Sequence, residues 1–143
     1  VGNWEELSSV IAPSSLDLVV ASHVIEHVPD DLKAINETHK VLKKGGVAIV
    51  STPNISRMSR LFLDLVQGKR EFPWWEHQRE YSLKSLTQLF ERSRFAKFEI
   101  LPVAFGVHFD ICKKRKKFMF IALRECPRVL RNYACSLEAV LWK

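Results

Sequence analysis

The chain has 143 residues, 47% of them hydrophobic, which is typical of one globular domain and excludes a disordered tail. Its 22 Lys and Arg against 16 Asp and Glu give a formal net charge of +6, an excess that favours anionic partners. The 3 cysteines have no Cys-x-x-Cys spacing and no apolar stretch reaches the ~20 residues of a spanning helix, so we expect a soluble, cytoplasmic protein without a disulfide framework or zinc cage.

The first predicted elements form a strand, helix and strand. Residues 16–21 (LDLVVA) and 47–51 (VAIVS) are short β-branched runs with apolar residues on both faces, typical of covered strands in a parallel sheet. Between them, Pro29-Asp30-Asp31 predicts a helix start, and Gly45 is expected just past the helix end, after Lys43-Lys44. This order predicts a right-handed parallel crossover.

The second half of the chain adds further helices and strands. Helical spacing predicts a helix over 56–66, and Ser82 can cap another. Residues 98–103 and 118–123 are predicted strands, with the basic run 113–117 in the loop between them. Such runs are usually solvated loops. The result is a four-stranded α/β layer.

The last segment is predicted to be helical. Pro127 can open a helix that continues to Trp142. Its apolar residues then fall on one helical face: Leu130, Ala134, Leu137 and Leu141. We therefore expect an extra helix at the end of the domain.

Polar residues gather where the two predicted parallel strands end. Ligands of open parallel sheets bind beyond the carboxyl ends of the strands, which here means residues 22–28 and 52–54. His23, Glu26 and His27 fall within one turn just past the first strand. This edge is the predicted functional site.

The stretch 15–54 closely resembles the second half of the class I S-adenosylmethionine-dependent methyltransferases. Segment 77–95 also resembles a later part of that family, with Arg94 in place of the usual Gly. The resemblance implies a Rossmann-like sheet with helices on both faces and S-adenosylmethionine as the cofactor. The matching motifs are Asp17-Leu18-Val19-Val20, Glu26-His27-Val28-Pro29-Asp30, Val41-Leu42-Lys43-Lys44-Gly45-Gly46 and Thr52-Pro53-Asn54.

The family's Gly-rich cofactor loop has no counterpart, because no two of the 5 glycines form a Gly-x-Gly after a strand. We therefore expect the carboxyl-terminal part of such a domain, inactive when isolated. Its expected parts are the end of the cofactor-binding half (1–54), an acceptor-site lid (55–81), a helix with strands (82–126) and the extra helix (127–143). The strand at 16–21 would self-associate through its exposed edge, be covered by that helix, or stay bare.

The resemblance implies cofactor contacts at four residues. Asn3 and Trp4 would lie at the adenine, with Asn3 in place of the family's Asp. An amide oxygen can still accept that hydrogen bond, though more weakly than a carboxylate; alternatively, Asn3 satisfies its own turn. Ser22 and His23 would lie beside the methionine part of the cofactor.

His27, next to Glu26, is the residue that we expect to carry chemistry. Methyl transfer mainly needs the nucleophile and the methyl group to be aligned. A base helps when the acceptor carries a proton, and an imidazole can take that proton from a hydroxyl or amine at neutral pH. In the alternative interpretation, His27 only caps the following helix.

The acceptor pocket is expected between 54 and 81, and a small molecule is the expected acceptor. With Phe72, the aromatic residues there could form a lid that stacks on a planar substrate, or they could be a small satellite core. The implied acceptor residues are Asn54, Trp74, Trp75, His77 and Tyr81.

Two further alternatives stay open. The His23-x-x-Glu26-His27 run, with His77 later, resembles the Glu-x-x-Glu-His metal cluster of ubiquinone-pathway and small-RNA methyltransferases. Because His23 replaces a carboxylate and disfavours Mg²⁺, we expect no metal and keep these residues as candidates. The basic run would contact phosphates if RNA were the acceptor. The chain could also be a non-catalytic interaction module.

Overall fold

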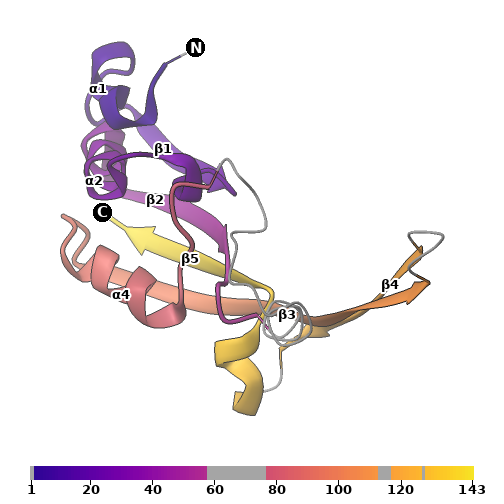
Figure 1. Cartoon of the computed structure of the whole chain (residues 1–143). Helices are drawn as coiled ribbons and strands as arrows, with labels where there is room; N and C mark the ends of the chain where they lie inside the picture. Colours follow the sequence, from indigo (N-terminus) through magenta and orange to yellow (C-terminus); the bar gives the residue numbers. More distant parts are fainter. Residues whose placement is uncertain (1, 58–76, 113–116, 127) are drawn as a thin grey trace.

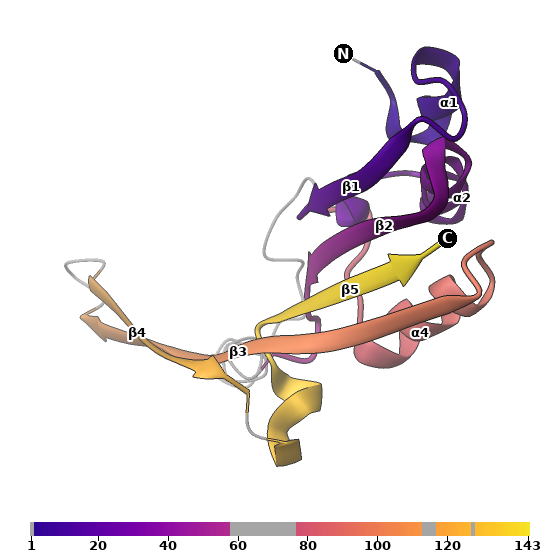
Figure 2. The ribbon, with the colours of Figure 1, turned by 180° about the vertical axis from the view of Figure 1, so that it is seen from behind.

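The computed structural model describes residues 2–57, 77–112, 117–126 and 128–143. Its 5-stranded sheet has the order β1-β2-β5-β3-β4 (Figures 1 and 2). Only the β1–β2 pair is parallel among the pairings of the described strands. The strands are β1 (Leu16–Ser22), β2 (Leu42–Pro53), β3 (Lys97–Cys112), β4 (Lys117–Glu125) and β5 (Ser136–Trp142).

The predicted strand, helix and strand are confirmed. Helix α2 (Asp31–Val41) connects β1 to β2, and the Asp30 side chain caps it by accepting a hydrogen bond from the Lys33 amide. In the parallel pair, Ser22 stands opposite Ser51, so both strands end at one edge of the sheet. That edge is where ligands of open α/β sheets bind.

The expected place of Gly45 is wrong. Helix α2 already ends at Val41, and β2 begins at Leu42. Gly45 therefore lies within the first residues of β2, at φ +83. Residues that carry a side chain rarely adopt this backbone conformation. Gly45 therefore permits the irregular start of β2, where the pairing with β1 shifts register after Leu16.

The Ser82-capped helix and the two later strands are confirmed. In α4 (Leu83–Glu91) the Ser82 hydroxyl accepts from the Ser85 amide, as a helix start requires. Strands β3 and β4 are longer than predicted and extend away from the rest of the sheet (Figure 1). Most of the helix expected at 56–66 and most of the basic run lie outside the described residues.

The predicted carboxyl-terminal helix is wrong. A short 3-10 helix, η3 (Arg128–Tyr133), is followed by β5, which pairs antiparallel with both β2 and β3. The side chains of Leu137, Ala139 and Leu141 are fully buried, every second residue. This alternation fits a strand with one covered face, and a position between two strands satisfies the backbone of β5 on both sides.

The core lies on one face of the sheet. Side chains from β2 and β5 pack there against α2 and α4, and helices expected on the other face are not found among the described residues. That other face exposes Leu18, Val20 and Leu101, and β1 is one of the two edge strands of the described sheet. Self-association through the unpaired side of β1 stays a prediction. In the described part of the chain, no helix is long and apolar enough to cross a membrane.

A buried carboxylate ties the first residues to α2. Both the amide and the hydroxyl of Ser8 donate to Glu37 Oε2, at 2.9 and 2.6 Å, and Lys40 pairs with Glu37 Oε1. Through Lys40 and then Ser8, these contacts lower the pKa of Glu37 to about 2. The pairing holds α1 (Leu7–Val10) and the 3-10 helix η1 (Trp4–Glu6) against α2.

We expect part of the stability to depend on pH through Glu37. Because folding lowers the pKa of this carboxyl, its contribution is complete above the unfolded value of 4.5 and is lost as the pH falls towards about 2. Urea unfolding should show Glu37→Gln to be less stable than wild type at pH 7 and equally stable near pH 2. An unchanged difference at both pH values would contradict this assignment.

Candidate active site

At the carboxyl ends of β1 and β2, the chain makes a sharp turn at His23, directly after β1. His23 has φ 52, a region that residues other than Gly rarely occupy, and its amide donates to Ser51 O at 3.0 Å. The Ser51 hydroxyl donates to Ser22 Oγ at 3.1 Å. These contacts turn the chain into the 3-10 helix η2 (Ile25–His27), which carries the two predicted catalytic residues.

Glu26 presents a buried carboxylate at this turn. Its residue is 1% exposed, and Oε2 accepts a hydrogen bond from Thr52 Oγ1 at the end of β2, at 3.1 Å. Oε1 has no hydrogen bond among the described residues and lies 3.6 Å from His23 Nδ1. An acceptor without a hydrogen bond in a buried position is costly, so Oε1 is available for a proton donor or a cation.

The segment 77–81 is fastened across η2. The amides of Gln78 and Arg79 both donate to Glu26 O, at 2.8 and 3.2 Å. The Arg79 guanidinium donates to Val28 O and Pro29 O, each at 2.6 Å. Backbone and guanidinium together therefore fix the start of this segment against η2.

Tyr81 holds the other end of segment 77–81 in place. Its hydroxyl donates to Asp31 Oδ2 at 2.7 Å, and burial together with this contact raises the pKa of Tyr81. The residue is 3% exposed. Tyr81, expected at the acceptor, thus packs in the core and anchors the segment.

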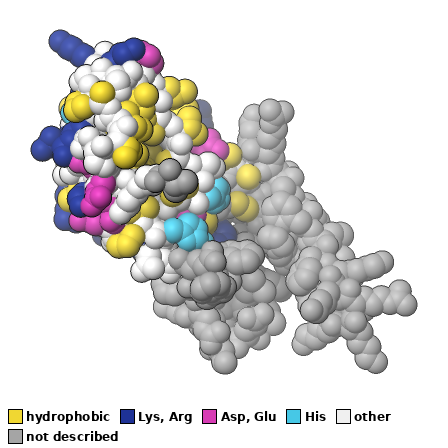
Figure 3. Space-filling view, turned by 90° about the horizontal axis from the view of Figure 1, so that it is seen from above, with side chains coloured by type: hydrophobic (Ala, Val, Ile, Leu, Met, Phe, Trp, Pro, Cys, Tyr) yellow, Lys and Arg dark blue, Asp and Glu magenta, His cyan; other side chains and the backbone are white. Residues whose placement is uncertain are grey.

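These contacts bring His77 against His27. The two rings meet edge to face, with centroids 4.7 Å apart. One ligand atom each from Glu26, His27 and His77 lies within 4.8 Å of the others. Figure 3 shows histidine side chains reaching the surface close together on the face that it presents. The structure therefore gathers three of the predicted residues into one cluster, the Glu26–His27–His77 cluster.

Two charged residues at the cluster were missed by the sequence analysis. Glu80 Oε1 lies 3.4 Å from His77 Nδ1 and 3.7 Å from Arg57 Nη2, and its side chain is 0% exposed. Arg57 also donates to Asn54 O at 2.9 Å. Neither residue stands out locally in the sequence, because this pairing joins the end of β2 to a segment far along the chain.

Other predicted residues have different surroundings. The Asn3 side chain accepts from the Glu5 amide and caps η1, as in the alternative interpretation. Asn54 is fully buried, and its amide donates to Asn132 O and Ala134 O, so it holds η3 to β2. Trp74 and Trp75, with Phe72, lie outside the described residues.

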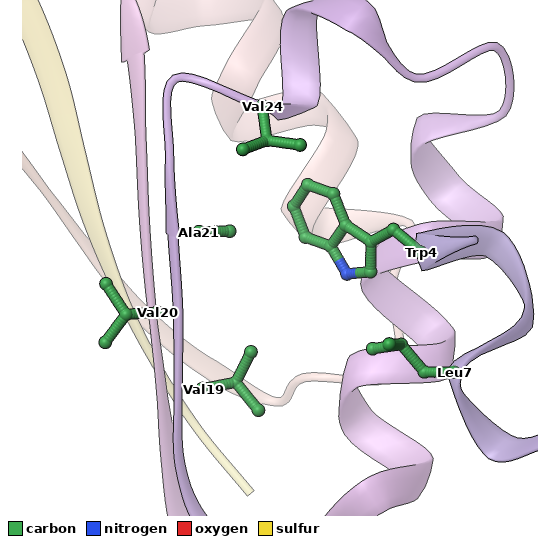
Figure 4. A pocket seen from close by; sticks show the side chains of 6 residues that line it. All are labelled: Trp4, Leu7, Val19, Val20, Ala21 and Val24. Carbon is green, nitrogen blue, oxygen red and sulfur yellow. The ribbon is translucent and has the colours of Figure 1, made fainter. Parts of the chain in front are cut away.

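A cavity of about 230 Å³ lies beside the first part of this edge. Figure 4 shows Trp4 and Leu7 facing β1 and Val24 across it. The Trp4 indole N–H donates to Thr38 Oγ1 at 2.7 Å, which fixes the ring. The lining is apolar and suits a flat ring more than a charged group: Trp4, Leu7, Val19, Ala21 and Val24, with Val20 of β1, whose side chain points to the other side of the strand (Figure 4).

Comparisons with known proteins agree with this fold. A family model described as "Methyltransferase domain" matches residues 4–99, more than half of the chain. A protein of Mycolicibacterium smegmatis, named "Probable S-adenosylmethionine-dependent methyltransferase", is 35% identical over 105 residues, which are 73% of this chain.

Solved structures share the fold at low sequence identity. A Thermotoga maritima methyltransferase, described as a possible histamine N-methyltransferase, matches 99% of the chain with 18% identity and a TM-score of 0.64. One from Archaeoglobus fulgidus matches 99% with 14% identity and a TM-score of 0.60. The chain spans 37% of the mycobacterial relative, 62% of the Thermotoga chain and 66% of the Archaeoglobus chain. On this sequence match and this fold, the chain belongs to the class I S-adenosylmethionine-dependent methyltransferases.

Proposed function

We propose that the whole protein transfers a methyl group from S-adenosylmethionine to an oxygen or nitrogen acceptor at the carboxyl edge of β1 and β2. The observation that carries this proposal is the Glu26–His27–His77 cluster at that edge. Its Glu26 and His77 side chains are 1% and 6% exposed, whereas His27 is exposed. An acceptor can therefore reach His27 from solvent while the other two side chains stay buried.

The residues of this chain fit part of the cofactor. The apolar cavity beside Trp4 suits an adenine ring, and the turn at Ser22 and His23 lies next to it at the end of β1. When bound, S-adenosylmethionine supplies an electrophilic methyl group. The backbone at the His23 turn would orient its methionine part, while the sequence has no Gly-x-Gly counterpart of the family's Gly-rich cofactor loop.

His27 is the base in this proposal. A hydroxyl or amine acceptor loses a proton when it is methylated, and an imidazole within hydrogen-bond reach can receive it. The edge-on contact with His77 holds the His27 ring in place. Glu26, directly before it, provides a carboxylate oxygen that can accept a hydrogen bond from the acceptor.

Calorimetry with S-adenosylhomocysteine tests the proposal. The whole protein should bind this demethylated product of the cofactor, and the isolated 143-residue chain weakly or not at all, because it holds only part of the site. With S-adenosylmethionine in its place, the whole protein should transfer the methyl group to an oxygen or nitrogen compound and release S-adenosylhomocysteine. A whole protein that binds no S-adenosylhomocysteine would instead support the non-catalytic interaction module.

A second candidate mechanism uses a metal ion at the same cluster. A tetrahedral ion bound at 2.0–2.1 Å needs ligand atoms about 3.3 Å apart, and those of Glu26, His27 and His77 lie within 4.8 Å of one another. Small side-chain rotations would close the set, and the buried Glu26 Oε1 lacks a hydrogen bond among the described residues. Two imidazoles and one carboxylate favour Zn²⁺ or a similar ion over Mg²⁺.

Cobalt titration separates the two mechanisms. If the metal is used, Co²⁺ should bind the protein in a 1:1 ratio with a visible absorption band, and His77→Gln should remove the band. His39→Gln, which changes a histidine that packs on Phe95, is the matched control. No band at millimolar Co²⁺ would exclude the metal mechanism and leave His27 as the base.

A further inference from the structure

A buried ion pair stands behind the histidine cluster. The Glu80 side chain is 0% exposed, and burying a carboxylate is costly unless cations and hydrogen-bond donors surround it. Its nearest described cationic groups are Arg57 Nη2 at 3.7 Å and His77 Nδ1 at 3.4 Å. The Glu80 carboxylate therefore lies between a fixed arginine and a histidine of the cluster.

Arg57 is held from the other side. Its Nη1 donates to Asn54 O at the end of β2, and the side chain is 15% exposed. Arg57 Nη2 and His77 Nδ1 both approach the same carboxylate oxygen, Glu80 Oε1. The His77 contact is the shorter of the two, so this oxygen lies at the Nδ1 end of the His77 ring.

We propose that Glu80 is a positioning residue that acts through His77. When His77 carries its proton on Nδ1, that N–H donates to Glu80, and a small rotation turns the 3.4 Å contact into an aligned, charge-assisted hydrogen bond. His77 Nδ1 is buried and makes no hydrogen bond among the described residues, so this tautomer removes a cost. A carboxylate on Nδ1 fixes both ring tautomer and orientation.

The consequence lies at the opposite end of the ring. With the proton on Nδ1, Nε2 of His77 is left as an acceptor. The His77 ring meets His27 edge to face, so a His77 ring fixed by Glu80 also fixes how the two rings contact each other. The effect of this tautomer on turnover rests on the proposed function. The tautomer itself rests only on the contact between Glu80 and His77.

Nitrogen NMR of histidine-labelled protein tests the inference. The ¹⁵N shifts of His77, assigned with His77→Gln, should show the Nδ1–H tautomer in excess by about tenfold or more, as a hydrogen bond to a charged group supports. Glu80→Met should remove most of this excess and Glu80→Gln part of it. Glu91→Gln, which changes an exposed glutamate of α4, should leave it unchanged.

Two results would overturn the inference: an Nε2–H tautomer in the wild type, or an unchanged tautomer in folded Glu80→Met. If that variant does not fold, Glu80→Gln decides in the same way, with Glu80→Asp as the variant that should restore the excess. In the whole protein, Glu80→Gln should lower kcat more than it changes KM. A changed tautomer with unchanged kcat would support the positioning by Glu80 and contradict the proposed role of the cluster.

Discussion

Replacing His27 with glutamine in the whole protein is expected to lower kcat by about 10²–10⁴-fold, the usual contribution of a positioned base. Glutamine keeps a polar side chain of similar reach but cannot accept the acceptor's proton. Binding of S-adenosylhomocysteine should stay nearly unchanged, because the apolar cavity at Trp4 and the turn at Ser22 do not include His27. Steady-state kinetics and calorimetry on the same preparation check both parts.

His39→Gln is the matched control for this variant. His39 lies on α2 and packs edge-on against Phe95, with ring centroids 5.0 Å apart, outside the cluster. Its substitution should leave kcat within a few fold of wild type. If His27→Gln also stayed within a few fold, the helix-capping interpretation of His27 would replace the base.

Arg79→Met is expected to have the largest effect on stability and to disorganise the cluster. The guanidinium donates to Val28 O and Pro29 O and lies 3.4 Å from Asp31. Hydrogen bonds from a charged donor contribute about 1.5–3 kcal/mol each, and this side chain is partly exposed, so we expect a loss of about 2–3 kcal/mol. Tm should fall by roughly 6–12 °C.

The control for Arg79 is an arginine at an exposed position outside the contacts with Val28 O and Pro29 O. Arg92→Met, at an exposed position after α4, should change Tm by no more than about 2 °C. Arg79→Lys should lie between the two, because lysine retains the charge but loses the paired geometry. Equal Tm values for Arg79→Met and wild type would show that the hydrogen bonds of Arg79 to Val28 O and Pro29 O contribute little to stability.

The parts of the fold predicted from the sequence are those with local causes. The apolar run before Ser22, the helix start at Pro29-Asp30-Asp31 and the Ser82 cap each depend on a few neighbouring residues, and all three are confirmed. The carboxyl-terminal helix failed because Leu137 and Leu141 fit a helical stripe as well as a strand. The alternation of Leu137, Ala139 and Leu141 could have decided the question, but the position between β2 and β3 is a long-range contact.

In the candidate site too, the residues with local sequence signals could be predicted and those that depend on long-range contacts could not. His23, Glu26 and His27 were placed at the end of β1 because their neighbours in the sequence define that edge. The pairing of Glu80 with Arg57 and His77 had no local pattern, since it depends on how segment 77–81 crosses η2. The role of Asn54 at the acceptor stays a prediction; its amide donates to Asn132 O and Ala134 O, a long-range contact that no local pattern indicates.

Hydrogen–deuterium exchange of the whole protein, with and without S-adenosylhomocysteine, tests most directly whether the methyl donor binds at this edge of the sheet. Slower exchange is predicted in residues 3–7, which carry Trp4, and in residues 22–27, which follow β1. Residues 105–110 of β3, which pair with β4, should exchange at the same rate in both samples. Saturating ligand with no protection in either segment would contradict the assignment of the cofactor and acceptor sites to the carboxyl ends of β1 and β2.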